Sequence, residues 1–125
     1  MIEIKSIYKS FEDRNVLDDI NFTFENGKTN LIIGQSGSGK TVLMKCLVGL
    51  LTPEKGEVLY DGRDFIAMDK DEKKALRREM GMIFQSAALF DSLSVLENVM
   101  FPLDMFSNKT YRERVKRAQF CLDRV

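Results

Sequence analysis

The feature that most constrains this sequence is a glycine-rich segment between two apolar runs. Residues 34–41 read Gly-Gln-Ser-Gly-Ser-Gly-Lys-Thr and fit the pattern Gly-x-x-x-x-Gly-Lys-[Ser/Thr] at every required position. Residues 29–33 precede it and predict a short strand buried on both faces. Leu43, Leu47 and Leu50 follow it at helical spacing. A strand, a glycine-rich turn and a helix in this order form the context that phosphate binding by this pattern requires, which disfavours a turn without a ligand.

Each residue type in this segment, the phosphate loop, suits a polyphosphate. Glycines let consecutive backbone N–H groups point into one concavity, and the N-terminus of the following helix adds a positive end. Lys40 supplies a positive charge for the β and γ phosphates, and the Thr41 hydroxyl is a ligand for Mg²⁺. Small size and backbone donors are the expected contributions of the two serines. The expected cofactor-binding residues of the loop are Gly34, Gln35, Ser36, Gly37, Ser38, Gly39, Lys40, Thr41 and Val42.

Composition excludes several other classes of function. The chain has 19 Lys and Arg against 19 Asp and Glu, and this balance argues against a nucleic-acid partner bound by electrostatics. It has no histidine, and Cys46 and Cys121 lie far apart, so we expect no metal cluster and no histidine-based mechanism. No apolar run approaches the roughly 20 residues of a membrane span, and the first residues carry no secretory signal. We therefore expect a cytosolic chain.

The remaining segments predict a β layer, further helices and a second buried strand. Alternating apolar residues near the N-terminus predict a hairpin. Capping-box spacings at Asp69–Glu72 and Thr110–Glu113 predict two helix starts, and the second helix is expected to run to the final residue. Cys46 is expected to be a small core residue. The expected elements are strands at residues 2–7, 20–24, 57–60 and 81–84 and helices at residues 69–79 and 110–125.

Residues on both sides of the phosphate loop resemble those of the ATP-binding subunits of ABC transporters, over essentially the whole chain. The segments that carry this resemblance are residues 8–11, 81–85, 89–90 and 94–99. The resemblance implies that Phe11 stacks on adenine. It also implies that Gln85 contacts Mg²⁺ and the attacking water and reports to membrane subunits. Without the resemblance, Phe11 would fit a core aromatic and Gln85 a polar residue at a strand end.

The resemblance implies an α/β fold: a P-loop NTPase (RecA-like) core with an antiparallel β subdomain, incomplete at the C-terminus. Residues 1–125 would be the N-terminal portion of a nucleotide-binding domain, because the signature, the Asp-Glu strand and the switch histidine are absent. The implied enzyme is an ABC-type ATPase with ATP and Mg²⁺ as cofactors. Its catalytic residues would be Lys40 and Gln85, and its metal ligands Thr41 and Gln85. This chain alone is expected to be inactive, since each missing charge-positioning group contributes several kcal/mol.

A narrower resemblance lies in residues 84–95, which contain Gln-Ser-x-Ala-Leu-Phe-Asp-Ser-Leu. This run is similar to the ATPases of MCE-associated, Mla-type phospholipid transporters, although Ala87 stands where those have glycine. The implied partners are a second ATPase subunit, membrane permease subunits and an MCE-domain lipid-binding protein, and the implied location is the cytoplasmic face of the inner membrane. Candidate contacts with the permease, for which core packing is the alternative, are Leu89, Phe90, Leu93 and Phe101.

Three alternatives stay open from the sequence. The chain fits an importer ATPase for another substrate, or an ATP-binding regulatory module without turnover. The third alternative, a P-loop GTPase or a small-molecule kinase, is the least favoured. A GTPase would need a guanine selector, and Asn108-Lys109-Thr110-Tyr111 lacks its aspartate. Val42 stands where many ATP-binding subunits of ABC transporters have a second hydroxyl residue, which contacts the α phosphate. In this chain we expect only the backbone N–H of Val42 to make that contact.

Overall fold

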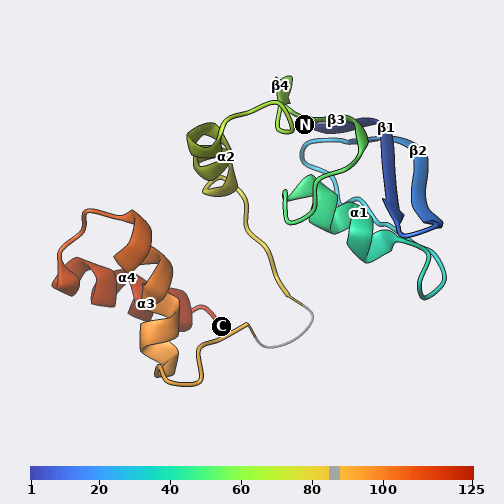
Figure 1. The fold of residues 1–125 in the computed structure, drawn as a ribbon. Helices are drawn as coiled ribbons and strands as arrows, with labels where there is room; N and C mark the ends of the chain where they lie inside the picture. The colour runs from blue at the N-terminus through green and yellow to red at the C-terminus, as the bar shows by residue number, and fades with distance from the viewer. Residues whose placement is uncertain (85–87) are drawn as a thin grey trace. The chain divides into compact units, whose positions relative to one another are not determined.

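The computed structural model describes residues 1–84 and 88–125. The chain forms two compact units, Met1–Gly81 and Met82–Val125, coloured blue to yellow-green and yellow to red in Figure 1. The first is called the sheet unit and the second the helical unit, and each is described by itself.

The sheet unit is built on an antiparallel hairpin. β1 (Ile2–Phe11) pairs with β2 (Arg14–Phe24) on one edge and with β3 (Lys55–Tyr60) on the other (Figure 1). The two-residue strand β4 (Arg63–Asp64) completes the order β2-β1-β3-β4. An irregular register between Ile4 and Ile7, with Ser6 at a φ of 46°, lets both isoleucines be buried although they are three residues apart. The predicted hairpin and the predicted strand at residues 57–60 are therefore confirmed.

The first helix joins the core of this sheet. α1 (Lys40–Leu47) buries Leu43, Cys46 and Leu47 in one cluster with the inward residues of β1, β2 and β3. Tyr60 fixes the C-terminal end of α1, because its hydroxyl donates a 2.8 Å hydrogen bond to the Leu47 carbonyl. Burial raises the pKa of the Tyr60 phenol to about 12. The predicted helix after the phosphate loop and the core position of Cys46 are confirmed.

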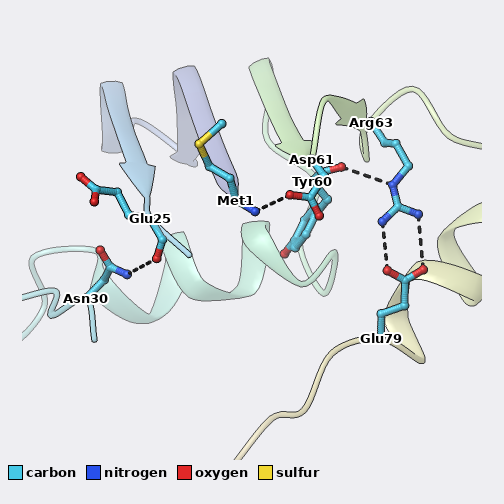
Figure 2. A network of polar contacts seen from close by, with 7 residues as sticks. All are labelled: Met1, Glu25, Asn30, Tyr60, Asp61, Arg63 and Glu79. Carbon is cyan, nitrogen blue, oxygen red and sulfur yellow. Dashed lines mark hydrogen bonds and ion pairs between the residues drawn. The ribbon is translucent and has the colours of Figure 1, made fainter. Parts of the chain in front are cut away.

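The second helix of the sheet unit is α2 (Lys70–Arg77), and its predicted capping box is present. Asp69 accepts from the backbone N–H groups of Asp71 and Glu72, while the Glu72 carboxylate accepts from the Asp69 N–H. Figure 2 shows the polar contacts at the β3–β4 turn: the amino group of Met1 pairs with Asp61, and the Arg63 guanidinium donates to both carboxylate oxygens of Glu79. These contacts tie the N-terminus and the segment after α2 to one end of the sheet.

The strand predicted at residues 29–33 does not form. This segment has no regular secondary structure, and the side chains of Leu31 and Ile33 are 82% and 80% exposed. The Asn30 amide donates to the Glu25 carbonyl at 3.5 Å (Figure 2) and also to the Lys28 carbonyl at 3.2 Å. A local turn therefore holds the start of the segment. The prediction was wrong because a strand needs a neighbouring strand, and none of the described strands pairs with these residues.

The helical unit consists of two helices. α3 (Val95–Phe106) begins at Ser94, and α4 (Tyr111–Leu122) begins at Thr110, each with a complete capping box. An ion pair of 3.0 Å between Arg114 Nε and Asp104 Oδ1 joins them. The predicted start of α4 is confirmed, but the helix ends at Leu122 rather than at the final residue, and α3 was not predicted.

The second predicted buried strand, at residues 81–84, is also absent. These residues have no regular structure, and the Ile83 side chain is 99% exposed. The cause is the same as at residues 29–33, since neither segment has a strand partner in the described parts of the chain. None of the helices within residues 1–84 and 88–125 combines the length and the apolarity needed to cross a bilayer.

Candidate functional site

The phosphate loop connects residues 29–33 directly to the start of α1. A hydrogen bond of 3.2 Å from the Ser38 N–H to the Gln35 carbonyl closes its turn. Gly39 is the N-cap of α1 and has a φ of 94°, and a Cβ at this position would lie 2.9 Å from the Val16 carbonyl oxygen of β2. Only glycine fits this backbone conformation and this close approach without strain. The glycine at position 39 therefore allows the start of α1 to pack closely against the hairpin.

The N-terminus of α1 is open to an anion. Gly39 offers no side-chain cap, and the first turn of the helix contains no acidic residue. The first intrahelical bond runs from the Leu43 N–H to the Gly39 carbonyl, so the N–H groups of the first turn have no intrahelical acceptor. Uncapped N–H groups and the positive end of the helix dipole favour a negatively charged ligand at this point.

The side chain of Lys40 folds back onto the loop. Its ammonium donates to the carbonyl oxygens of Gly34 and Gln35, both at 2.7 Å. The positive charge therefore lies at the concavity of the loop. Phosphate oxygens would be stronger acceptors for this ammonium than neutral carbonyls, because charge-assisted hydrogen bonds are about twice as strong.

A hollow of about 230 Å³ lies where the loop, α1 and the hairpin meet. Its lining includes Arg14 and Val16 of β2 together with Gly37 and residues 39–42. Sequence reasoning missed Arg14 and Val16. No local motif marks them, and the only available signal was their place on the far strand of the predicted hairpin. Their presence gives the hollow a second cationic side chain and an apolar wall.

Phe11 lies at the end of β1, opposite Arg14 in the hairpin register. Its side chain is 44% exposed, so Phe11 is not a core aromatic residue. A partly exposed ring beside a residue of the hollow fits a stacking surface for a flat base, and the stacking role itself stays a prediction. Gln85, the other residue inferred from the resemblance, lies outside the described residues.

The candidate partner-contact residues lie on the helical unit. Leu89, Phe90 and Phe101 are exposed, and Leu93 is half-buried. The rings of Phe90 and Phe101 contact each other with centroids 4.7 Å apart. The Asn98 side chain fixes this loop on α3: it accepts from the Phe90 N–H and donates to the carbonyl of that residue. The helical unit thus presents a partly apolar surface whose loop is fixed by the hydrogen bonds of Asn98.

The side chains alone do not form a metal centre. Among the described residues, no group of three or more His, Cys, Asp and Glu side chains is placed to hold a metal ion. The exposed hydroxyl of Thr41 at the start of α1 is the donor that the phosphate loop itself offers. This donor set fits Mg²⁺ that takes most of its ligands from phosphate oxygens and water.

Comparison with known proteins agrees with this arrangement. Residues 17–125 match the ABC transporter family. The chain is 43% identical, over 103 residues, to the intermembrane phospholipid transport system ATP-binding protein MlaF of Haemophilus influenzae, covering 82% of this chain and 39% of that protein. It is 42% identical, over 122 residues, to the methionine import ATP-binding protein MetN of Symbiobacterium thermophilum, covering 93% of this chain and 37% of that protein. The chain thus spans less than half the length of these curated relatives.

A solved structure shares the fold. The dimeric post-hydrolysis state of the ATP-binding cassette MJ0796, bound to ADP and Pi, superposes with a TM-score of 0.86 at 32% identity, covering 98% of this chain and 56% of that chain. This likeness confirms the predicted α/β fold of the P-loop NTPase class, and the antiparallel sheet of the first unit is the predicted β subdomain. On the strength of its phosphate loop, its fold and the match over residues 17–125, the chain belongs to the ABC transporter family, within the ATP-binding cassette.

Proposed function

We propose that residues 1–125 are the N-terminal portion of an ABC-type ATPase and that the phosphate loop binds ATP with Mg²⁺. The observation that carries the proposal is the meeting of the uncapped N-terminus of α1 and the Lys40 ammonium at one hollow. Backbone N–H groups and a lysine on one concave surface fit a polyphosphate better than a neutral ligand.

The residues of the loop divide the work of holding the phosphates. Lys40 exchanges its two carbonyl acceptors for oxygens of the β and γ phosphates, and the backbone N–H groups of residues 37–42 surround them. Thr41 contributes its hydroxyl to Mg²⁺, which when bound neutralises the charge on the phosphates. Phe11 would stack on the adenine, and Gln85 would contact Mg²⁺ and the attacking water.

Hydrolysis in this proposal takes place in a dimer of ATPase subunits. The solved MJ0796 cassette, a dimeric post-hydrolysis state bound to ADP and Pi, supports this part of the proposal. The Asp-Glu strand and the switch histidine, which ABC transporter ATPases use for hydrolysis, are absent from residues 1–125. We therefore expect hydrolysis from the full-length protein and not from these residues alone.

We further propose that the ATPase powers phospholipid transport. The similarity to MlaF and the run at residues 84–95 support this substrate class. The partners would be membrane permease subunits, which contact Leu89, Phe90, Leu93 and Phe101, and an MCE-domain lipid-binding protein. The protein would then lie on the cytoplasmic face of the inner membrane. The sequence identity to MetN is nearly the same as that to MlaF, and it supports import of a small molecule as the alternative.

Replacing Lys40 with alanine tests the site. ATP affinity of the full-length protein, measured by isothermal titration calorimetry, is expected to fall about 10- to 100-fold, because charged hydrogen bonds contribute about 1.5–3 kcal/mol. Lys45→Ala is the matched control, since Lys45 is exposed on the last turn of the same helix. Unchanged ATP affinity in Lys40→Ala would overturn the role of the phosphate loop.

The substrate class is tested on the full-length protein assembled with its permease. We expect phospholipid vesicles to raise the rate of ATP hydrolysis and L-methionine to leave it unchanged. Stimulation by methionine alone would replace the lipid proposal with the import alternative. ATP binding without hydrolysis in this assembly would instead indicate a regulatory module.

A further inference from the structure

A single carboxylate organises the end of β1 next to Phe11. Glu54 Oε2 accepts from the Ser10 hydroxyl at 2.6 Å, and the two carboxylate oxygens accept from the Ser10 N–H at 3.1 and 3.2 Å. Glu54 Oε1 also accepts from the Lys9 ammonium at 3.0 Å. Glu54 therefore holds the two residues that directly precede Phe11.

Glu54 itself stands on a fixed backbone. Its N–H donates to the Tyr8 carbonyl at 2.9 Å, and the next residue, Lys55, begins β3 and pairs with Tyr8. Pro53, immediately before it, is buried and has a restricted backbone. The carboxylate is thus anchored by the sheet, so the geometry that it imposes on Ser10 is set by β3 and not by a free loop.

Lys9 links the carboxylate to the aromatic ring. Its ammonium lies over the Phe11 ring, 5.3 Å from the centroid, while it is paired with Glu54. The Lys9 side chain is only 16% exposed, so this position is confined. A cation over one face of a ring is attracted by the ring quadrupole. The pairing therefore orients the ring, which is itself partly exposed to solvent.

We propose that Glu54 is a positioning residue for Phe11: by holding Ser10 and the Lys9 ammonium, it fixes the ring face on which the adenine base of ATP stacks. This inference rests on the proposed function. Phe11 is paired with Arg14, which lines the hollow beside the phosphate loop, so the ring orientation decides whether a base can lie against it while the phosphates occupy the loop. Glu54 thus acts on recognition of the base and not on the phosphates.

The test compares two ligands that share phosphates but differ in the base. Affinities of the full-length protein for ATP and for inorganic tripolyphosphate are measured by isothermal titration calorimetry. Glu54→Ala is expected to weaken ATP about threefold to tenfold, the range of one aromatic contact, and to leave tripolyphosphate affinity unchanged. Lys9→Met, which keeps an apolar stem and removes the charge, is expected to weaken ATP alone as well. Glu57→Ala, which removes an exposed carboxylate on β3 three residues after Glu54, is the control that changes neither affinity.

A double variant shows whether Glu54 acts through Phe11. In Phe11→Ala, the additional change Glu54→Ala is expected to cost no further ATP affinity, because the group that it positions is gone. Additive losses, equal losses for ATP and tripolyphosphate, or unchanged ATP affinity in both Glu54→Ala and Lys9→Met would each overturn the positioning role alone. A wild-type protein that binds neither ligand would overturn the proposed function as well.

Discussion

β1 and residues 29–33 each contain three aliphatic side chains, yet they differ strongly in the structure. β1 pairs with β2 on one edge and β3 on the other, and its side chains Ile4 and Ile7 are fully buried. Leu31 and Ile33 are exposed, and their segment has no strand partner among the described residues. The difference teaches that apolar sequence makes a segment able to enter a sheet, while the neighbouring strands decide whether it does.

The backbone explains why the two regions differ so strongly. An extended segment satisfies its N–H and C=O groups only through a neighbour or through water. β1 finds two neighbours in β2 and β3 by local antiparallel pairing. Residues 29–33 have no such neighbour among the described strands. The side chains of Leu31 and Ile33 stay in water, while Ile32 packs, partly buried, against the core.

Hydrogen exchange gives the largest expected contrast between the two regions. Amides of β1 are expected to exchange on the order of 10³-fold more slowly than those of residues 30–33, because opening a paired core strand costs most of the global stability. Mass spectrometry or NMR on the 125-residue chain measures both rates. Comparable protection would mean that residues 30–33 have found a partner strand, and the contrast would disappear.

A matched pair of isoleucine substitutions measures the same contrast as an energy. Ile7→Ala removes a fully buried side chain from β1 and is expected to lower the free energy of unfolding by about 2–5 kcal/mol. Ile33→Ala removes an exposed side chain and is expected to change it by less than about 0.5 kcal/mol. Urea unfolding of the 125-residue chain, followed by circular dichroism, provides both values. A large loss from Ile33→Ala would show that this residue is packed.

The smallest expected effect is a change in the stability of the fold at low pH, caused by Glu54 at the end of β1. Hydrogen bonds from Ser10, followed by the pairing with Lys9, lower the pKa of Glu54 from 4.5 to about 2. A lowered pKa stabilises the fold above pH 4.5, and this contribution is lost as the pH falls from 4.5 toward about 2. We expect the melting temperature to fall slightly more over this range in wild type than in Glu54→Gln. Identical pH profiles would show that the contacts of Glu54 do not stabilise the sheet.

Local signals predicted much of the fold. The hairpin, α1, β3 and the starts of α2 and α4 follow from alternation, helical spacing and capping boxes, which act within a few residues. α3 carried the same signal, since Ser94 and Glu97 form a capping box, but Pro102 inside the helix runs against the usual helix pattern. The predictions of strands at residues 29–33 and 81–84 were wrong, because the pairing of strands is not a local property of the sequence.

The candidate site was predictable where one motif contains it. The glycines, Lys40 and Thr41 of the phosphate loop were found by their spacing alone. Arg14 and Val16 were not, because they reach the hollow through the hairpin register and the close approach of Gly39 to β2. Glu54 was also missed, since it meets Ser10 from 44 residues away along the chain. Contacts of this range depend on the complete sheet.

The exposed apolar segments also govern how solutions of this chain behave. Leu31 and Ile33 are exposed, and their backbone pairs with none of the described strands, so it offers a template for the backbone of another copy. The equal numbers of basic and acidic residues give copies no mutual repulsion near the isoelectric point of about 6.3. We expect colloidal stability to be lowest near that pH and to recover well above it, where the copies carry like charge.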